Sequence, residues 1–493
     1  MPYDDRPRNI GTSIVQRTNI RSMIFRILYK LWTFLLPSFI TSHFGADEKP
    51  SIVHSTAWLD GLRGWAAVVV FFHHTHYLFF NSNDGWHFNE KAVQLWRLPV
   101  IHSVFMGHTA VSVFFVVSGF TLSLQPVKLM QNGDSTKLFS ILSSAAIRRP
   151  FRLYGPLIVS TFLVFMFGRL GAFAYSETYI AGFLAWSEYH YKIQRPEFWL
   201  DFWLWLKQTL NFCTADIYHW TTPMAKAYVW DPHLWTIPVE FRCSMTLYLT
   251  QLTVGRMKSR MRLSVLIGLT VLSVFRDWWG IQLFWAGMIL CELYTLHSSH
   301  AVRALPVTST TSTIAQNRIP FIMSALHAVN LVSAFYLLSI PEVGCDKTPG
   351  FIILCNNLTP SGMSHWWPVA FRFWAGVGAV QLVAGVALSA TLQPWGRYSL
   401  ASLLSKPLSR YLGSISYSLY CIHGITNHTF GIPIWYAVFE ITGRGRGWYI
   451  GYFISMTFQT VATVWLSDIF WRVVDMKSVI MAKRVEEVFL GWA

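Results

Sequence analysis

The sequence predicts an all-α integral membrane protein, a polytopic bundle of about ten transmembrane helices. Its 493 residues are 53% hydrophobic and only 13% charged, with a mean hydropathy of +0.37. The apolar residues gather into runs near spanning length, and many basic residues lie in the short loops between them. A single water-soluble core would not need so much apolar material. The net charge of +15 is therefore interpreted as a topology signal, and nucleic-acid binding is not expected.

The first apolar segment, Met23 to Ile40, is interrupted by Arg26 and Lys30. A basic amphipathic stretch of this kind is typical of a helix that lies in the membrane interface, and it lacks the pattern of a cleaved leader. We expect the polar residues before it to stay in the cytosol. The expected organisation is a cytosolic N-terminal region with this interfacial helix over 1–56, a transmembrane domain over 57–470 and a cytosolic tail over 471–493.

Ten apolar runs reach or approach the length that a membrane-crossing helix needs. The fifth is the shortest and the weakest candidate. The runs lie at about 63–80, 103–125, 153–173, 235–254, 262–275, 278–297, 320–340, 368–390, 410–428 and 448–467.

The loops between these runs alternate in positive charge. One set contains 14 Lys and Arg residues and one acid, whereas the other contains 10 basic residues and 12 acids. Because cytosolic loops carry the excess of Lys and Arg, the first set and both termini are placed in the cytosol. Without a signal peptide, the endoplasmic reticulum is the expected membrane. The first set is 126–152, 255–262, 298–319 and 391–410; the second is 81–102, 174–234, 276–277, 341–367 and 429–447.

Two outer loops carry further signals. Loop 341–367 contains Cys345, Cys355 and the sequon Asn357-Leu358-Thr359, which predict a disulfide and a glycosylation site; unrelated thiols and a chance tripeptide are the alternative. Loop 174–234 is rich in Trp and Tyr, typical of a segment at the membrane interface, as a lid or as plain anchoring. No cysteines have CxxC spacing, so no metal site is expected.

Arg63 and His74 lie in one apolar run that begins with Leu59-Asp60-Gly61-Leu62. In a helix, eleven residues return to within roughly 20° of the same face and rise by about 16 Å. One face thus carries a cation at its start and a base deep in the run, while His73 and His76 point elsewhere. An ionisable side chain inside a span indicates a functional site, although a buried, hydrogen-bonded structural histidine is the alternative.

Three arginines, Arg148, Arg149 and Arg152, precede the third apolar run on the cytosolic side. Arg149 and Arg152 share a helix face, and guanidinium groups bind phosphates well. A positive-inside anchor is the alternative interpretation. With Arg63 they would place a group of guanidinium side chains at the cytosolic rim.

Glu240 and His423 are the remaining candidates inside apolar runs. Glu240 follows Trp235-Thr236-Ile237-Pro238-Val239, and a carboxylate at that depth must be paired or used. Arg242, Arg63 or a histidine could pair with it, or it could form a structural ion pair. His423 lies about 20 Å along the ninth run from its cytosolic end, at a depth like that of His74. Arginines at the cytosolic rim and bases deeper in the bundle would suit acyl-coenzyme A. Its phosphates would meet the arginines, and its thioester, at the far end of the pantetheine arm, would meet the bases.

These motifs, in this order, resemble the acyltransferase 3 family of integral membrane proteins. The resemblance spans about 57 to 470. The motifs are Leu-Asp-Gly-Leu-Arg-Gly with Arg63-x10-His74, Phe114-Phe115-Val116-Val117-Ser118-Gly119-Phe120, the pair Arg149 and Arg152, Leu234-Trp235-Thr236-Ile237-Pro238-Val239-Glu240-Phe241, and Ser416-Tyr417-Ser418-Leu419-Tyr420-Cys421-Ile422-His423.

The resemblance implies about ten membrane helices and acyl transfer, commonly acetyl, from a coenzyme A thioester to a hydroxyl, with an essential Arg-x10-His pair. Acyl-coenzyme A is then a co-substrate, and no permanently bound cofactor is expected. The long aromatic loop and the basic amphipathic N-terminus most resemble filamentous-fungal members, several of which serve secondary metabolism. Where many members have a leucine-rich segment before the Glu, this chain has Ile237-Pro238-Val239, which could redirect Glu240.

The sequence thus predicts a membrane O-acyltransferase acting on a small molecule such as a terpenoid or polyketide alcohol. A polysaccharide, glycolipid or sterol acceptor is the alternative, and a proton-coupled transporter is the alternative from another class. The predicted catalytic residues are His74, Glu240 and His423, and the predicted coenzyme A-binding residues are Arg63, Arg148, Arg149 and Arg152. His74 is the preferred general base, because an imidazole titrates near neutral pH.

Overall fold

The computed structural model describes residues 12–44, 54–77, 79–80, 83–90, 92–173, 197–215, 230–303, 313–360, 369–392, 399–443, 445 and 447–491. The chain divides into two compact units, Met1–Ile52 and Val53–Ala493. Over the described ranges, its regular structure consists of α-helices and short 3-10 and π helices, with no strand. The predicted all-α fold is confirmed.

The first unit contains α1 (Thr12–Leu35) and α2 (Ser38–Phe44). Pro37 separates them, because proline lacks a backbone N–H and disfavours helical geometry in the residue before it. The predicted segment from Met23 to Ile40 is therefore largely helical, but its helix begins earlier and breaks before its end.

Each of the ten predicted runs in the second unit coincides with a helix. These helices are α3 (Ala57–Tyr77), α4 (Gly107–Asn132), α5 (Ser135–Arg169), α8 (Thr236–Val254), α9 (Ser259–Phe275), α10 (Trp279–Arg303), α11 (Thr313–Leu338), α12 (Val369–Leu392), α14 (Pro407–Thr426) and α16 (Trp448–Phe470).

Five helical stretches are long and apolar enough to cross a membrane, and Met323–Leu338 is a shorter apolar helix. The chain is thus a helical membrane protein, while the number of ten spans stays a prediction. The five stretches are Gly107–Asn132, Ser135–Arg169, Trp279–His297, Ala370–Ala390 and Trp448–Leu490.

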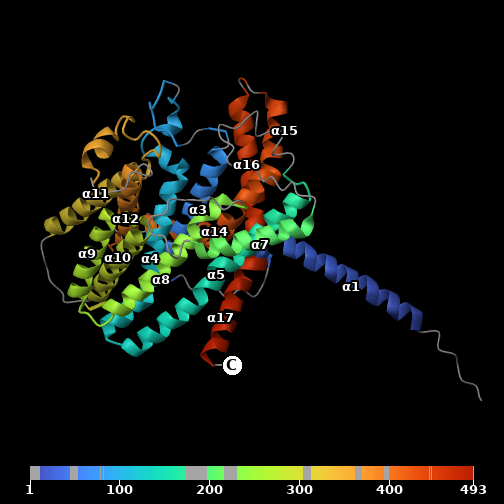
Figure 1. The fold of residues 1–493 in the computed structure, drawn as a ribbon, viewed down its shortest axis with the longest axis horizontal. Coiled ribbons are helices and arrows are strands. Elements are labelled where there is room, and N and C mark those ends of the chain that lie inside the picture. Colours follow the sequence, from blue (N-terminus) through green and yellow to red (C-terminus); the bar gives the residue numbers. More distant parts are fainter. Residues whose placement is uncertain are drawn as a thin grey trace, which may run out of the picture. The chain divides into compact units, whose positions relative to one another are not determined.

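Several helices lie in segments that the sequence did not mark as apolar runs. These are α7 (Phe198–Ala215), α13 (Leu400–Leu404), α15 (Ile432–Thr442) and α17 (Met476–Leu490), and α5 begins well before residue 153. α13 and α15 are too short to span a membrane, and charged residues interrupt the apolar pattern of α7 and α17, so a search for long apolar runs misses them. α17 packs along α5, and it continues from α16 through the π turn η7 (Trp471–Asp475) (Figure 1).

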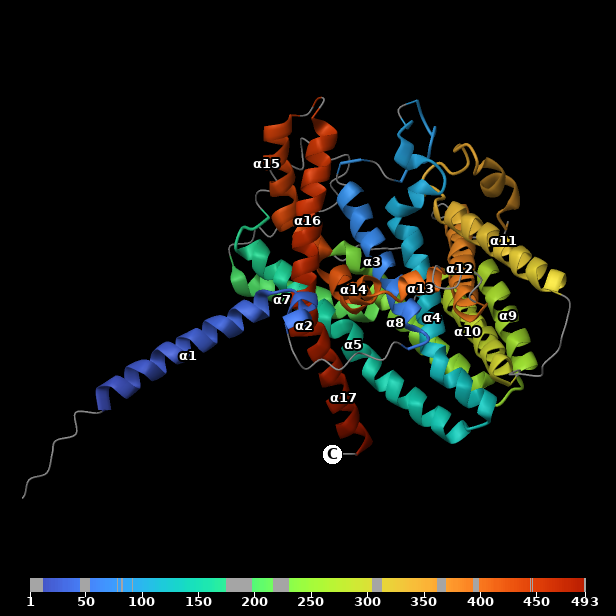
Figure 2. The same cartoon turned by 180° about the vertical axis from the view of Figure 1, so that it is seen from behind.

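The pair α3 and α14 lies near the centre of the second unit, with α9 to α12 on one flank and α15 to α17 on the other (Figures 1 and 2). The two helices approach closely at glycines. A Cβ on Gly64 would lie 2.4 Å from the backbone nitrogen of Gly413, and one on Gly413 would lie 2.3 Å from the Asp60 carbonyl oxygen. The glycines around Arg63 therefore serve helix contact, since only glycine allows backbones so near.

α4 and α10 form a second close pair. A Cβ on Gly119 would lie 2.2 Å from the Phe284 carbonyl oxygen, and one on Gly287 would lie 2.2 Å from that of Val116. The Ser118-Gly119-Phe120 segment is thus a helix-packing site, as small residues commonly are in membrane bundles.

Two of the predicted outer loops meet at one end of the unit. Asp84 forms an isolated backbone bridge with Val343, and the backbone N–H of Val100 donates to Ser339 Oγ at 2.9 Å. Arg97 lies 3.9 Å from the Asp84 carboxylate. Burial raises the pKa of Asp84, and the positive charge of Arg97 partly offsets that rise. These contacts agree with placing loops 81–102 and 341–367 on one side.

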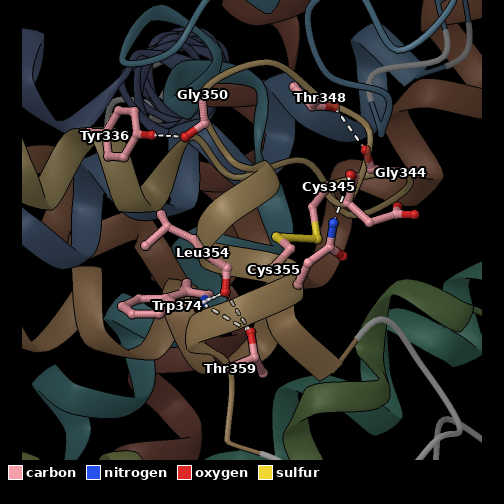
Figure 3. Close-up of a disulfide and its surroundings, with 11 residues drawn as sticks. Tyr336, Gly344, Cys345, Thr348, Gly350, Leu354, Cys355, Thr359 and Trp374 are labelled. Carbon is pink, nitrogen blue, oxygen red and sulfur yellow. Dashed lines mark hydrogen bonds between the residues drawn. A yellow bond between two sulfur atoms is a disulfide. The ribbon is translucent and has the colours of Figure 1, made fainter.

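The predicted disulfide between Cys345 and Cys355 is present in this region of the unit (Figure 3). Trp374 of α12 donates its indole N–H to the Leu354 carbonyl at 3.1 Å and to Thr359 Oγ1 at 3.2 Å, which anchors the loop to the bundle. Asn357 of the sequon is exposed, so its side chain is accessible for glycosylation.

Candidate active site

Three histidines from distant parts of the sequence meet in the second unit. They are His74 of α3, His233 of the 3-10 turn η3 (Pro232–Trp235) and His423 of α14, called the histidine cluster below. One ring nitrogen of each lies within 4.8 Å of the others. The ring centroid of His74 is 4.2 Å from that of His233 and 5.2 Å from that of His423. His233 and His423 are buried, whereas His74 is half-buried.

Asp231 positions His233. Its Oδ1 accepts the backbone N–H of His233 at 3.1 Å and lies 2.9 Å from His233 Nδ1. The Asp-Pro sequence explains this local geometry, because Asp is a favoured N-cap and Pro232 suits the first position of a helix. Since a carboxylate only accepts, His233 Nδ1 donates and its lone pair is on Nε2. The arrangement is the aspartate–histidine pair of many general-base sites.

Residues of α14 complete the cluster. His423 Nδ1 donates to the Tyr420 carbonyl at 2.8 Å, and the Tyr420 hydroxyl contacts the carbonyl of His233 and Thr236 Oγ1. Tyr420 thereby ties η3 to α14. A Cβ on Gly424 would lie 2.8 Å from His233 Nδ1 and 3.0 Å from Asp231 Oδ2. Glycine at this position leaves room for the aspartate–histidine pair.

Glu240 lies in a different polar group. Its Oε1 accepts from Arg149 Nη2 at 2.6 Å and from Ser118 Oγ at 3.2 Å, and Arg149 Nε also donates to Ser244 Oγ at 3.1 Å. The partner of Glu240 is thus Arg149, and not Arg242, Arg63 or a histidine as the sequence had suggested. The carboxylate that contacts the histidine cluster is Asp231.

The predicted phosphate-binding arginines separate into two kinds. Arg152 lies within electrostatic reach of Arg63 and Arg149, and of Asp475. Arg148 instead pairs with Glu486 of α17 at 3.1 Å. The structure therefore brings Arg63, Arg149 and Arg152 together, called the arginine group below, and directs Arg148 toward the last helix.

The two groups lie along one helix. Arg63 and His74 both belong to α3, and eleven residues of α-helix separate them by about 16 Å. His73 and His76 leave this face as predicted: His73 Nδ1 donates to the Phe105 carbonyl at 2.7 Å, and His76 Nδ1 lies 2.7 Å from the Tyr452 hydroxyl. One face of α3 thus carries a cation, Arg63, toward one end and a titratable base, His74, toward the other.

Residues 56–472 match the acyltransferase 3 family, described as an acyltransferase domain. The chain belongs to this family. It is 28% identical over 475 residues to the O-acetyltransferase PaAT-1 of Phomopsis amygdali, covering 91% of this chain and 87% of the relative. It is also 25% identical over 464 residues to the acyltransferase clz18 of Cochliobolus lunatus, covering 85% and 93%. No solved structure matches the chain.

A third relative is the acyltransferase R4 of Phoma sp. (strain ATCC 20986 / MF5453), 22% identical over 460 residues and covering 85% of this chain and 93% of the relative. Family and relatives together establish an enzyme, an acyltransferase, whose helices suit a membrane. The predicted family and enzyme class are confirmed.

Two residues of the acyltransferase's candidate site lie outside those predicted from its sequence. Asp231 and His233 precede α8 in a segment interpreted as an interfacial lid or as plain anchoring, and hydropathy does not separate them from it. A usable signal was present: Asp-Pro-His starts a helix at the outer end of an apolar run, where His423 also lies. Their convergence with His74 depends on how three helices pack, which no local pattern reveals.

Proposed function

We propose that the protein is an acyl-coenzyme A-dependent O-acyltransferase, with acetyl as the preferred acyl group, and that it acts on a hydroxyl of a small molecule. One observation carries the proposal: three imidazoles meet at one end of α3, and guanidinium groups gather about 16 Å away toward its other end. Coenzyme A has phosphates at one end and a thioester at the far end of a slender arm. The name of the O-acetyltransferase relative supports acetyl as the transferred group.

In this mechanism His74 removes the acceptor proton. His74 is the half-buried member of the cluster and hence the one that substrates reach. As its imidazole takes the proton, the acceptor oxygen bonds to the thioester carbonyl carbon. The C–S bond then breaks and the thiolate receives the proton, so one ester and one free thiol form for each thioester consumed. Asp231 stabilises, through His233, the positive charge that develops in the cluster.

At the other end, Arg63 and Arg152 bind the coenzyme A phosphates. Guanidinium groups suit phosphate oxygens because they donate in a planar fork. Arg149 is already engaged by Glu240, so its part is to hold α5 against α8. Glu240 is therefore a positioning residue in this mechanism, and His423 supports the cluster from α14.

Thiol release from acetyl-coenzyme A, followed in membranes that contain the full chain and a hydroxyl acceptor, tests this function. Thiol release that depends on both acceptor and His74 is the expected result. Solute flux that follows a pH gradient, without consumption of thioester, would instead indicate a transporter. Comparing metabolites of a deletion strain for species lighter by one acyl group would identify the acceptor class, whether terpenoid, polyketide, sterol, glycolipid or polysaccharide.

We further propose that both termini face the cytosol, in the endoplasmic reticulum. A cysteine label near Arg63 tests the orientation, and Asp60 is the suitable position because 59% of its side chain is exposed. Gly61 is unsuitable, because a Cβ there would lie 1.9 Å from the Leu404 carbonyl oxygen. In sealed microsomes, Asp60→Cys should react with an impermeant maleimide added outside. Reaction only after the vesicles are opened would reverse the assigned orientation.

A further inference from the structure

The histidine cluster presents ring nitrogens that accept. The Nδ1 atoms of His233 and His423 are directed at a carboxylate oxygen and a carbonyl oxygen, at 2.9 Å and 2.8 Å. These oxygens only accept, so both Nδ1 atoms carry the proton, and the neutral rings keep their lone pairs on Nε2. Each ring is fixed in orientation by that bond.

One of these lone pairs is buried. His423 is 0% exposed, and its Nε2 has no hydrogen-bond partner within the described part of the chain. Asp231 is 1% exposed, and its Oδ2 also has no hydrogen-bond partner among the described residues. A buried acceptor without a partner costs free energy. The arrangement is therefore complementary to a group that offers positive charge.

The donor set suits a particular class of cation. Imidazole nitrogen favours zinc and neighbouring transition metals, whereas magnesium and calcium prefer oxygen. Three histidines that leave a fourth position open form a known type of zinc site, with Zn–N bonds of about 2.0–2.1 Å and hence N–N separations of about 3.4 Å. The nitrogens of the cluster lie within 4.8 Å of one another, so an approach of about 1.4 Å would close them onto the ion.

Asp231 supplies the outer contact that such a site requires. Histidine ligands of zinc commonly donate their other ring N–H to a carboxylate or a backbone carbonyl, which holds the ring and raises its basicity. Asp231 does this for His233, and the Tyr420 carbonyl does it for His423. Both kinds of support are present before any ion binds.

We propose that the histidine cluster binds one zinc-type divalent cation through His74, His233 and His423, and that this binding competes with acyl transfer. Metal binding itself depends only on the cluster. The competition rests on the proposed function, because a lone pair of His74 that coordinates zinc cannot accept the acceptor's proton. Zinc should thus inhibit, and a chelator should restore activity.

The binding test uses the purified full chain in detergent. After chelator treatment and dialysis against zinc chloride, inductively coupled plasma mass spectrometry should find about one zinc per chain. His233→Gln and His423→Gln should each weaken binding about tenfold or more. His76→Gln removes a buried imidazole from the same helix as His74 but outside the cluster, and it should leave the zinc content unchanged. Equal loss in all three variants would overturn the site.

A second measurement needs no variant. Cobalt(II) added to the unaltered protein should give the intense visible absorption of a tetrahedral ion with nitrogen ligands, and zinc should displace it. Absence of both the absorption and of bound zinc would overturn the proposal. Thiol release in metal-free buffer would still test the proposed function alone. Bound zinc whose removal abolishes thiol release would overturn the competition and the base role of His74 together.

Discussion

The arginine group and the histidine cluster, at the two ends of the α3 face, place different kinds of polar side chain inside the helical bundle. In the arginine group the charges are permanent, and Arg149 is neutralised by Glu240 at 2.6 Å. In the histidine cluster the bases can exchange protons, and Asp231 is the carboxylate that contacts His233. A permanent charge can hold an anion but cannot exchange a proton. In the proposed function, binding therefore belongs to the first end and chemistry to the second, and substitutions at each end can separate the two.

The largest effect is expected from His74→Gln, which removes the proposed base and keeps a polar side chain. The turnover rate kcat for thiol release should fall about 10³-fold, within the range that general-base catalysis contributes. The KM for acetyl-coenzyme A should change little. His87→Asn, in an exposed outer loop, is the matched control and should keep full activity. If His74→Gln kept the wild-type kcat, His74 would not be the general base.

Asp231→Asn should lower kcat by about 10²-fold, because the neutral amide no longer stabilises a positive charge on the cluster. The side chain keeps its size, so the cap of η3 should persist. Steady-state kinetics at several pH values checks this. A shift of the pH profile together with lower kcat supports the positioning role, whereas loss of protein yield with unchanged kcat would indicate a purely structural one.

Arg149→Gln should destabilise the fold more than it affects substrate binding. The side chains of Arg149 and Glu240 are 11% and 21% exposed, and removing one partner leaves the other charge poorly solvated. Loss of about 3 kcal/mol is expected from pairs of this kind. A thermal shift assay in detergent measures it, and the double variant Arg149→Gln/Glu240→Gln should recover most of the stability. If Arg149→Gln kept its Tm but had a raised KM for acetyl-coenzyme A, Arg149 would instead be a coenzyme A-binding residue.

The smallest effect is expected from Arg152→Gln. It should raise the KM for acetyl-coenzyme A about tenfold, the loss of one charge-assisted contact, without changing the KM for the acceptor. Arg148→Gln is the matched control, because Arg148 pairs with Glu486 and lies outside the arginine group. Equal increases for donor and acceptor would show that Arg152 supports the fold and not the donor site.

Much of the fold could be predicted because long apolar runs require helices in a membrane. The apolar runs gave the positions of ten helices, and the cysteines of one predicted outer loop gave the disulfide. α7 and α17 were missed because charged residues interrupt their apolar pattern, and α15 was missed because its 11 residues are too few to span a membrane. Arg63 and His74 were paired from helical spacing alone, because both lie on one element.

The partners across helices could not be derived in this way. The sequence allowed several candidate partners for Glu240. Only the packing of α5 against α8 shows that its partner is Arg149. His233 and Asp231 join the site because two residues of α14 position η3 beside it. The Tyr420 hydroxyl contacts the His233 carbonyl, and Gly424 has no side chain that would clash with the aspartate–histidine pair. The sequence by itself determined the helical membrane fold, the family motifs and the spacing along α3. Only the tertiary structure decided which bases meet, because contacts between distant helices depend on packing geometry and not on local pattern.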